Sequence, residues 1–175
     1  SEGQFNVDTF NIANTGTFNM AHGVRVQNAS ASAFNNAGRL AVAAEKTATI
    51  TGNYTQTPAG TFQTGVAGNA QYGKLEVSGT ATLPAAARIA VDVVGSPALT
   101  NGTVLPAVIK AGTLNASTFA VTDNSALFDF RAAQNGNSVD LAIAASSQTG
   151  IFDAVSGNSN PAAGAAARVL DSLTV

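Results

Sequence analysis

Apolar and polar residues alternate in short runs along residues 1–95, and Gly and Asn separate the runs. A period of two is typical of strands with one buried face, so this region is predicted to form β-strands and no helix. Three of the runs begin with glycine at intervals of 22 residues: GTFNM at 16–20, GRLAV at 38–42 and GTFQT at 60–64. As equivalent strands, they would stack side chains in two columns, Phe18 with Leu40 and Phe62, and Met20 with Val42 and Thr64.

A fixed period of 20 to 50 residues is the signature of a solenoid, in which each coil buries its apolar side against its neighbours. Other strand positions recur at intervals of 24 and 27, which indicates loops of variable length: Val24/Val26, Ala48/Ile50 and Leu75/Val77. The pattern therefore predicts a parallel β-helix with roughly four to five coils before residue 95.

A second repeat competes with this interpretation. TATI at 47–50 and TATL at 80–83 follow the similar tetrads RLAV at 39–42 and KLEV at 74–77, which favours a period near 34. Three glycine-led copies against two favour 22. Since 33 is not a multiple of 22, TATI and TATL are expected on different sides of the coil, each with Thr outward and with Ala and Ile or Leu inward.

The pattern changes after residue 95. Residues 95–103, GSPALTNGT, form a turn-rich break, and an apolar strand is predicted at 103–111. Pro106 lacks an N–H group and is expected to keep that strand out of a central position in a sheet. Residues 125–145 carry two apolar arms around Asn135-Gly136, which predicts a tight hairpin. Antiparallel hairpins would then cap the open end of the solenoid, with Phe128, Phe130, Val139 and Leu141 as the core of the cap.

One segment, residues 159–175, has a helical pattern. Asn160 is the predicted N-cap and Pro161 the first helical residue, while Ala162, Ala166, Val169, Leu170 and Leu173 share one face. The predicted organisation is β-helix coils at 1–95, a hairpin cap at 96–145, and a linker with an α-helix at 146–175. The fold class is thus all-β, with one short helix.

Charge changes the picture of the surface. Only 10% of the residues are charged, where a soluble domain has roughly a quarter, and the net charge is −2. Eight scattered basic residues give no footprint for nucleic acid. The absence of cysteine excludes disulfides, thiolate metal sites and cysteine nucleophiles. No apolar run of transmembrane length and no signal peptide are recognisable.

Candidate chemistry is sparse. His22 is the only histidine, which rules out multi-histidine metal sites and leaves His22 as the only possible base of a Ser-His-Asp triad. Because it directly precedes Gly23, it is expected to be a turn residue. We predict no catalytic, cofactor-binding or metal site and no enzymatic activity. The carboxylates show no cluster at one-coil spacing and are interpreted as solvated surface: Asp8, Glu45, Glu76, Asp92, Asp123, Asp129, Asp140, Asp153 and Asp171.

Asparagines and tyrosines are the remaining candidates. The asparagines of the first coils are interpreted as amide ladders and turns, with a glycan-binding face as the alternative: Asn6, Asn11, Asn14, Asn19, Asn28, Asn35 and Asn36. Exposed aromatics would indicate an adhesin, and only Tyr54 and Tyr72 are expected to be available for such contacts.

Five segments, in this order, resemble the carboxyl-terminal passenger region of Gram-negative type V autotransporters of the pertactin-like group. They are ITGNYTQTPAGTF (50–62), YGKLEVSGTATL (72–83), RIAVDVV (88–94), ALFDFRAAQNGNSVDLAI (126–143) and PAAGAAARVLDSL (161–173). The resemblance runs from about residue 38 to the end, and residues 1–37 match only loosely.

The resemblance implies a right-handed β-helix closed by an autochaperone region, then a helix leading into an outer-membrane β-barrel that this chain lacks. The implied function is structural: a folding module of a passenger that is secreted or displayed at the cell surface, with the barrel and the upstream coils as partners. Two alternatives stay open, namely an adhesin for an unidentified host ligand and a β-helical polysaccharide-degrading enzyme. As an adhesin, the module would belong to a virulence factor and would contact host matrix or cells.

Overall fold

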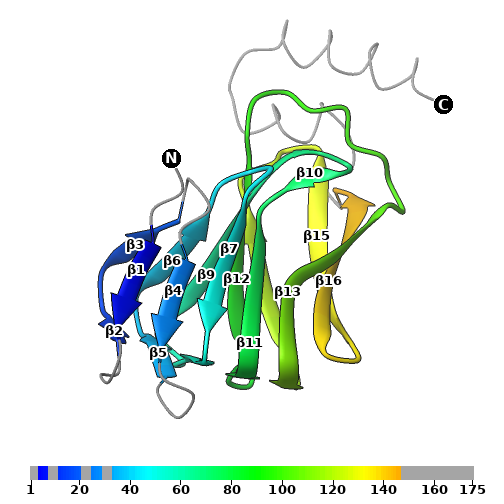
Figure 1. Cartoon of the computed structure of the whole chain (residues 1–175). Helices are drawn as coiled ribbons and strands as arrows, with labels where there is room; N and C mark the ends of the chain where they lie inside the picture. The colour runs from blue at the N-terminus through cyan, green and yellow to red at the C-terminus, as the bar shows by residue number, and fades with distance from the viewer. Residues whose placement is uncertain (1–3, 8–11, 21–24, 29–32, 147–175) are drawn as a thin grey trace, which may run out of the picture.

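The computed structural model describes residues 4–7, 12–20, 25–28 and 33–146 (Figure 1). This part of the chain is all-β and contains no helix, so it has none that could cross a membrane. Its sixteen strands form one sheet of ten strands and one of six. The predicted helix and most of the linker lie outside the described residues.

The larger sheet has the order β1-β4-β7-β11-β13-β16-β15, with β2, β5 and β8 attached beside it. Its strands are β1 (Gln4–Val7), β2 (Ile12–Asn14), β4 (Arg25–Asn28), β5 (Ala33–Asn36), β7 (Thr47–Thr51), β8 (Asn53–Gln56), β11 (Lys74–Thr82), β13 (Val104–Asn115), β15 (Phe128–Asn135) and β16 (Ser138–Ala145). The smaller sheet has the order β14-β12-β9-β6-β3, with β10 paired to β9. Its strands are β3 (Thr17–Asn19), β6 (Arg39–Val42), β9 (Thr61–Gly68), β10 (Gln71–Tyr72), β12 (Ala87–Val93) and β14 (Phe119–Asp123).

The register of the smaller sheet confirms the predicted 22-residue spacing. Phe18 pairs with Leu40, and Leu40 pairs with Phe62, all in parallel strands. Leu40 and Phe62 are fully buried and Phe18 is partly buried at the end of the column. The second column is buried as well, since Met20, Val42 and Thr64 are at most 1% exposed. We call each unit from one glycine-led strand to the next a repeat.

The competing period near 34 is wrong. RLAV forms β6 in the smaller sheet and aligns with residues 61–64, whereas KLEV begins β11 in the larger sheet and aligns with TATI. TATL continues β11 and aligns with β8 instead. The two TAT words therefore occupy different columns, with their alanines and their Ile50 or Leu83 buried as predicted.

Both sheets turn apolar side chains into one buried cluster. The all-β architecture with parallel sheets is thereby confirmed. The described residues do not show a solenoid, so the right-handed β-helix stays a prediction. In Figure 1, β1, β2 and β3 lie at one end of the row of strands, and β15 and β16 lie at the other.

The predicted hairpin is present, although its turn lies one residue further on. β15 and β16 pair antiparallel from Phe128 with Ala145 to Asn135 with Ser138. The two loop residues are consequently Gly136 and Asn137, and Gly136 has a φ of 57°. A glycine with positive φ at the first loop position is typical of a type II′ turn, in which the Asn before it closes the strand.

Three of the four residues expected in the core of the cap are buried. Phe130 is 5% exposed, while Val139 and Leu141 are fully buried. Phe128 is only partly buried, and Leu127, the apolar residue just before it, is 68% exposed. Leu127 precedes the first paired residue of β15, so no strand alternation directs its side chain inward.

The prediction that Pro106 excludes its strand from the sheet interior is wrong. β13 lies between β11 and β16, pairing parallel with the first and antiparallel with the second. The register with β16 shifts between Leu105 and Ile109, and pairing with β11 starts only at Ile109. Pro106 thus occupies a bulge, where its missing N–H leaves no gap in the hydrogen-bonded ladder.

Candidate functional site

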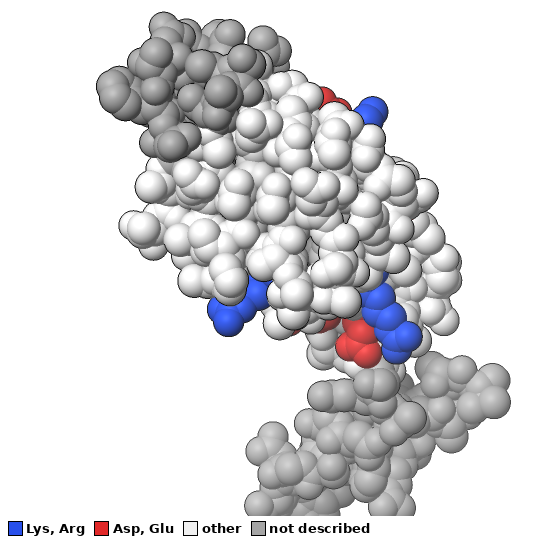
Figure 2. All heavy atoms as spheres, turned by 90° about the horizontal axis from the view of Figure 1, so that it is seen from below, with Lys and Arg blue, Asp and Glu red and all other residues white. Residues whose placement is uncertain are grey.

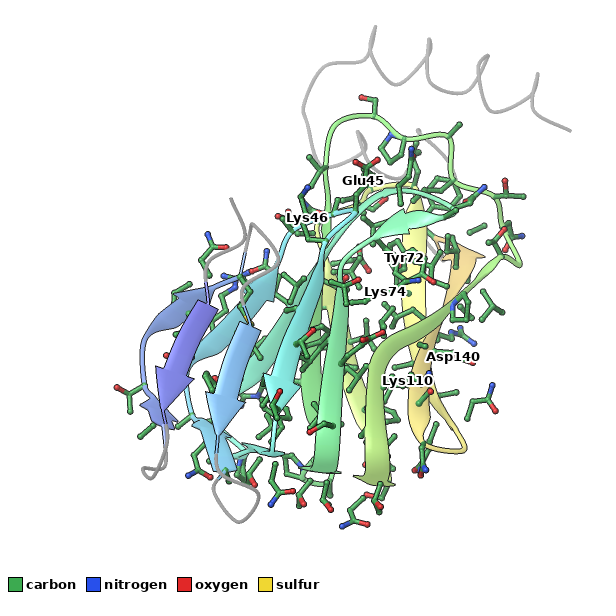
Figure 3. The ribbon with its side chains drawn as sticks, viewed as in Figure 1. Glu45, Lys46, Tyr72, Lys74, Lys110 and Asp140 are labelled. Atoms are coloured by element: carbon green, nitrogen blue, oxygen red, sulfur yellow. The ribbon has the colours of Figure 1, made fainter. Side chains whose placement is uncertain are left out.

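The bulge of β13 is held from two sides, by Tyr72 and by Asp140, at the end of the molecule that carries β15 and β16 (Figure 3). Tyr72 from β10 donates its hydroxyl to the carbonyl oxygen of Pro106 at 2.7 Å. Asp140 from β16 accepts the N–H of Ala107 on Oδ1 at 2.7 Å. Ala107 has a φ of 53°, a conformation that an L-residue adopts only when its surroundings enforce it. The two contacts fix the bulge and, with it, the path of β13.

The hairpin is tied to the bulge and to β13 by polar side chains. Asp140 accepts a second bond on Oδ2 from Asn135 at 2.9 Å, just before the turn. In the turn itself, Asn137 donates its side-chain amide to the carbonyl oxygen of Gly112 at 2.8 Å and accepts the N–H of Ala111 on its backbone oxygen. The cap is therefore anchored through its turn as well as through its buried face.

A ladder of buried amides runs through the other end of the molecule. Asn14, Asn36 and Gln56 occupy equivalent positions of β2, β5 and β8. Asn14 donates to Asn36 Oδ1 at 2.9 Å, and Asn36 donates to the hydroxyl of Tyr54 at 3.2 Å. That hydroxyl donates to Gln56 Oε1 at 3.1 Å, and Gln56 donates to the carbonyl oxygen of Arg88 at 3.0 Å. Every step of the ladder is donated in the same direction, toward the capped end.

The predicted amide ladder is thus confirmed for Asn14 and Asn36. Asn19 is exposed and Asn35 is half-buried, because the residues on either side of each in the sequence are the ones that face inward. Asn11 and the side chains of Asn6 and Asn28 lie outside the described residues. Gln56 was not among the expected members, although its place two residues after Tyr54 repeats that of Asn36 after Phe34.

The expectation that both tyrosines are exposed is wrong. Tyr54 is fully buried, with its ring 6.2 Å from that of Phe34, and Tyr72 is 5% exposed beneath the ammonium group of Lys74. Their hydroxyls find partners inside the protein, which is the usual condition for burying a tyrosine. Neither ring offers the surface contact on which the adhesin alternative depends.

The stability of the protein should fall above pH 10 because of Tyr54. Burial raises the pKa of the Tyr54 phenol well above its ordinary value, against a smaller opposite effect of the Asn36 hydrogen bond. Its contribution is complete below the unfolded pKa of about 10 and is lost as the pH rises toward the folded value, at about 1.4 kcal/mol per pH unit. Urea unfolding at pH 8 to 11 measures this slope. Tyr54→Phe should be less stable at pH 8 and lose that part of the slope; an unchanged slope would contradict the assignment.

The outer face of the smaller sheet carries a groove of about 670 Å³, lined among others by Thr17, Asn19, Arg39, Gln63 and Asp92. Arg39 and Asp92 give it one group of each sign, and Asp92 accepts a hydrogen bond from Asn124. Figure 2 shows a surface that is largely uncharged, with few acidic and basic side chains.

The carboxylates do not gather into a metal site. Within the described ranges no group of three or more His, Cys, Asp or Glu side chains could hold a metal ion. Glu76 faces Lys110 across β11 and β13, and Asp123 accepts the N–H of Ser125. His22, Asp8, Asp153 and Asp171 lie outside the described residues. Asp140 holds both the bulge and the residue before the turn, a structural role that its sequence context alone does not indicate.

Comparison of the chain with protein family models, curated proteins and solved structures found no match. The similarity to autotransporter passengers therefore rests on the five segments named above. Two of them coincide with structural features: ITGNYTQTPAGTF contains Tyr54 and Gln56 of the ladder, and ALFDFRAAQNGNSVDLAI forms the hairpin β15–β16.

Proposed function

We propose that this chain is a structural and folding module, the autochaperone-containing end of a Gram-negative autotransporter passenger with a right-handed β-helix. Its task is to fold first outside the cell and to template the folding of preceding coils. It carries out no chemistry. Its partners are those preceding coils and the outer-membrane β-barrel of the same protein, and it is secreted or held at the cell surface.

The observation that carries the proposal is the difference between the two ends of the row of strands. At one end the antiparallel hairpin β15–β16 lies against β13, so the last parallel strand of that column is paired on both sides. At the other end β1 and β3 each have a paired neighbour on one side only among the described strands. The larger sheet thus ends in an antiparallel hairpin on one side, where β15 and β14 are the edge strands of the two sheets. On the other side both sheets end, among the described strands, in parallel strands with which a further parallel strand could pair.

Stacked strands give this asymmetry an energetic meaning. Each repeat contacts chiefly the repeats before and after it, so stability is close to a sum of repeat and interface contributions. A new repeat that pairs with a formed edge gains an interface at once, whereas the first one must order its backbone without a neighbour. A stable closed end therefore lowers the nucleation cost of everything that follows.

Deleting residues 96–145 from the full passenger should leave it protease-sensitive and poorly displayed. The deletion removes β13 to β16, so β11 and β12 each lose the neighbour on one side and the apolar cluster is opened. Surface display by antibody labelling of intact cells and protease resistance of the displayed passenger measure the effect. Unchanged display together with unchanged resistance would refute the folding role.

A pair of leucine variants separates capping from mere chain length. Leu141→Ser places a hydroxyl in the fully buried core of the cap, at a cost of about 3 kcal/mol, and should impair display. Leu127→Ser changes the same side chain where it is 68% exposed and should leave display at the wild-type level. Equal display of the two variants would contradict the proposal that the packed hairpin is the folding nucleus.

A further inference from the structure

The repeats fit together through glycines. A Cβ atom at Gly38 would lie 2.1 Å from the backbone oxygen of Gly16, and one at Gly60 would lie 2.1 Å from the backbone oxygen of Asn36. Neither glycine has a positive φ, so the reason for each is space: the carbonyl of the preceding repeat occupies the side-chain position. Gly16 stands at the equivalent place of the first of these repeats.

Gly16 has no such neighbour in the described structure. No heavy atom of the described residues lies within 4 Å of a Cβ built there, and its φ is not in the left-handed region. Alanine would fit this position without strain. The glycine thus leaves the same empty space that a backbone carbonyl fills in the two following repeats.

The amide ladder also stops short at this end. Asn36 Oδ1 accepts the side-chain amide of Asn14, whereas Asn14 Oδ1 accepts, among the described residues, the N–H of Gly16 alone, at 3.2 Å. In the next repeat the equivalent N–H, that of Gly38, donates at 2.8 Å to the backbone oxygen of Asn14. Asn14 thus supplies from its own side chain the acceptor that a backbone carbonyl of the preceding repeat supplies to Gly38, and its Oδ1 is the first amide acceptor of the ladder among the described residues.

The apolar column ends at the same place. Phe18 is partly buried, whereas Leu40 and Phe62 behind it are fully buried. Its ring meets Phe34 edge-on at 5.3 Å, and the side chain stays only partly buried. The amide acceptor of Asn14, the open side-chain position of Gly16 and the ring of Phe18 therefore lie together at this end. The next repeat has the same three kinds of residue in the same order along the chain.

We propose that Asn14, Gly16 and Phe18 form a docking site for one more parallel segment of the pattern apolar-x-Asn/Gln-x-Gly-x-apolar. The inference rests on the proposed function and names the segment that is templated. The incoming amide donates to Asn14 Oδ1, an incoming carbonyl enters the space at Gly16, and the second apolar residue covers Phe18. Residues 12–18 and 34–40 of this chain both follow the pattern.

A second copy of the chain fits the site less well than such a segment. The hairpin covers the far end of the larger sheet, and the free edge of the smaller one, β14, reads FAVTD, which has neither the amide nor the glycine. Two identical open ends would bring acceptor against acceptor at Asn14. The occupant is therefore the neighbouring repeat of the same polypeptide.

A peptide of residues 33–42 with blocked ends, which carries the pattern from this chain, tests the site. Added to the full chain, it should shift the backbone amide signals of Thr17 and Asn19 in ¹⁵N NMR spectra. The same peptide with Asn36→Leu should bind about tenfold more weakly, since one buried hydrogen bond is lost. The Gly16→Ala protein should bind the unsubstituted peptide at least about tenfold more weakly than the wild-type protein does. Its own thermal midpoint should stay that of the wild-type protein.

Three results would overturn the proposal: no shift at Thr17 and Asn19 at millimolar peptide, equal binding to the Gly16→Ala variant, or self-association of the chain that Gly16→Ala abolishes. The last would assign the site to a second copy. Failure of the proposed function is separate, because it is read from display after deletion of residues 96–145. A passenger that needs its cap while the peptide does not bind refutes the docking site alone.

Discussion

Gly60→Ala is expected to destabilise the protein by about 3 kcal/mol, the upper end of what overpacking costs. The new methyl group would lie 2.1 Å from the backbone oxygen of Asn36 and 3.0 Å from its carbonyl carbon, so the backbone of two repeats must separate. The same backbone oxygen accepts the N–H of Thr57 at 2.9 Å, and this bond would be disturbed as well. Thermal unfolding by circular dichroism should show a midpoint roughly 6–12 °C lower.

Gly16→Ala is the matched control for this substitution. It introduces the same methyl group at the equivalent position of the first described repeat, where no described atom lies within 4 Å. Its midpoint should equal that of the wild type. If the two variants unfold at the same temperature, close packing of the repeats on glycine is refuted.

Asn36→Leu should cost about 2–4 kcal/mol although it places an apolar side chain in an apolar core. Asn36 is fully buried and takes part in three bonds, accepting from Asn14 and donating to Tyr54 and to the carbonyl oxygen of Thr61. Leucine cannot make any of these three bonds, so each partner stays buried with one hydrogen bond fewer. A buried polar group without a partner costs about 1–3 kcal/mol. Urea unfolding at neutral pH measures the loss.

Asn35→Leu is the control at the neighbouring position. Asn35 is half-buried on the opposite face of β5, so the substitution should change the free energy of unfolding by less than about 0.5 kcal/mol. If Asn36→Leu were as stable as Asn35→Leu, the ladder would contribute nothing to the fold. Asn36→Leu can also be combined with Tyr54→Phe. If the double variant has the same free energy of unfolding as Asn36→Leu alone, the main cost of Asn36→Leu lies at the tyrosine hydroxyl.

Much of the strand arrangement could be predicted because it depends on spacing alone. The glycine-led runs repeat at a constant interval, and each strand's alternation determines which side chains face inward, so the column of Phe18, Leu40 and Phe62 follows from the sequence. The hairpin was predictable for a similar reason, since two apolar arms flank an Asn-Gly pair. Its exact turn was not, because Gly136 suits either the second loop position or the first.

The errors lie where long-range contacts decide. The missing N–H of Pro106 argues against a central strand, but a bulge held by Tyr72 and Asp140 accommodates this proline between two strands. The sequence around Tyr54 does not reveal that Asn36 and Gln56 supply partners for a buried hydroxyl. The deciding residues are distant in the sequence: Tyr72 is 34 positions from Pro106, Asp140 is 33 from Ala107, and Asn36 is 18 from Tyr54. No local pattern identifies them.

The distance along the chain between stacked residues grows toward the cap, while their pairing stays parallel. Leu40 and Phe62 are 22 residues apart, Phe62 and Ile89 are 27 apart, and Ile89 and Val121 are 32 apart. The added length lies in the longer strands β9 and β13, in β10 and in the segments that join the strands, while the paired residues keep their register. The segments that join the strands can therefore change in length while the paired strands keep their register, which leaves room for surface loops of new specificity.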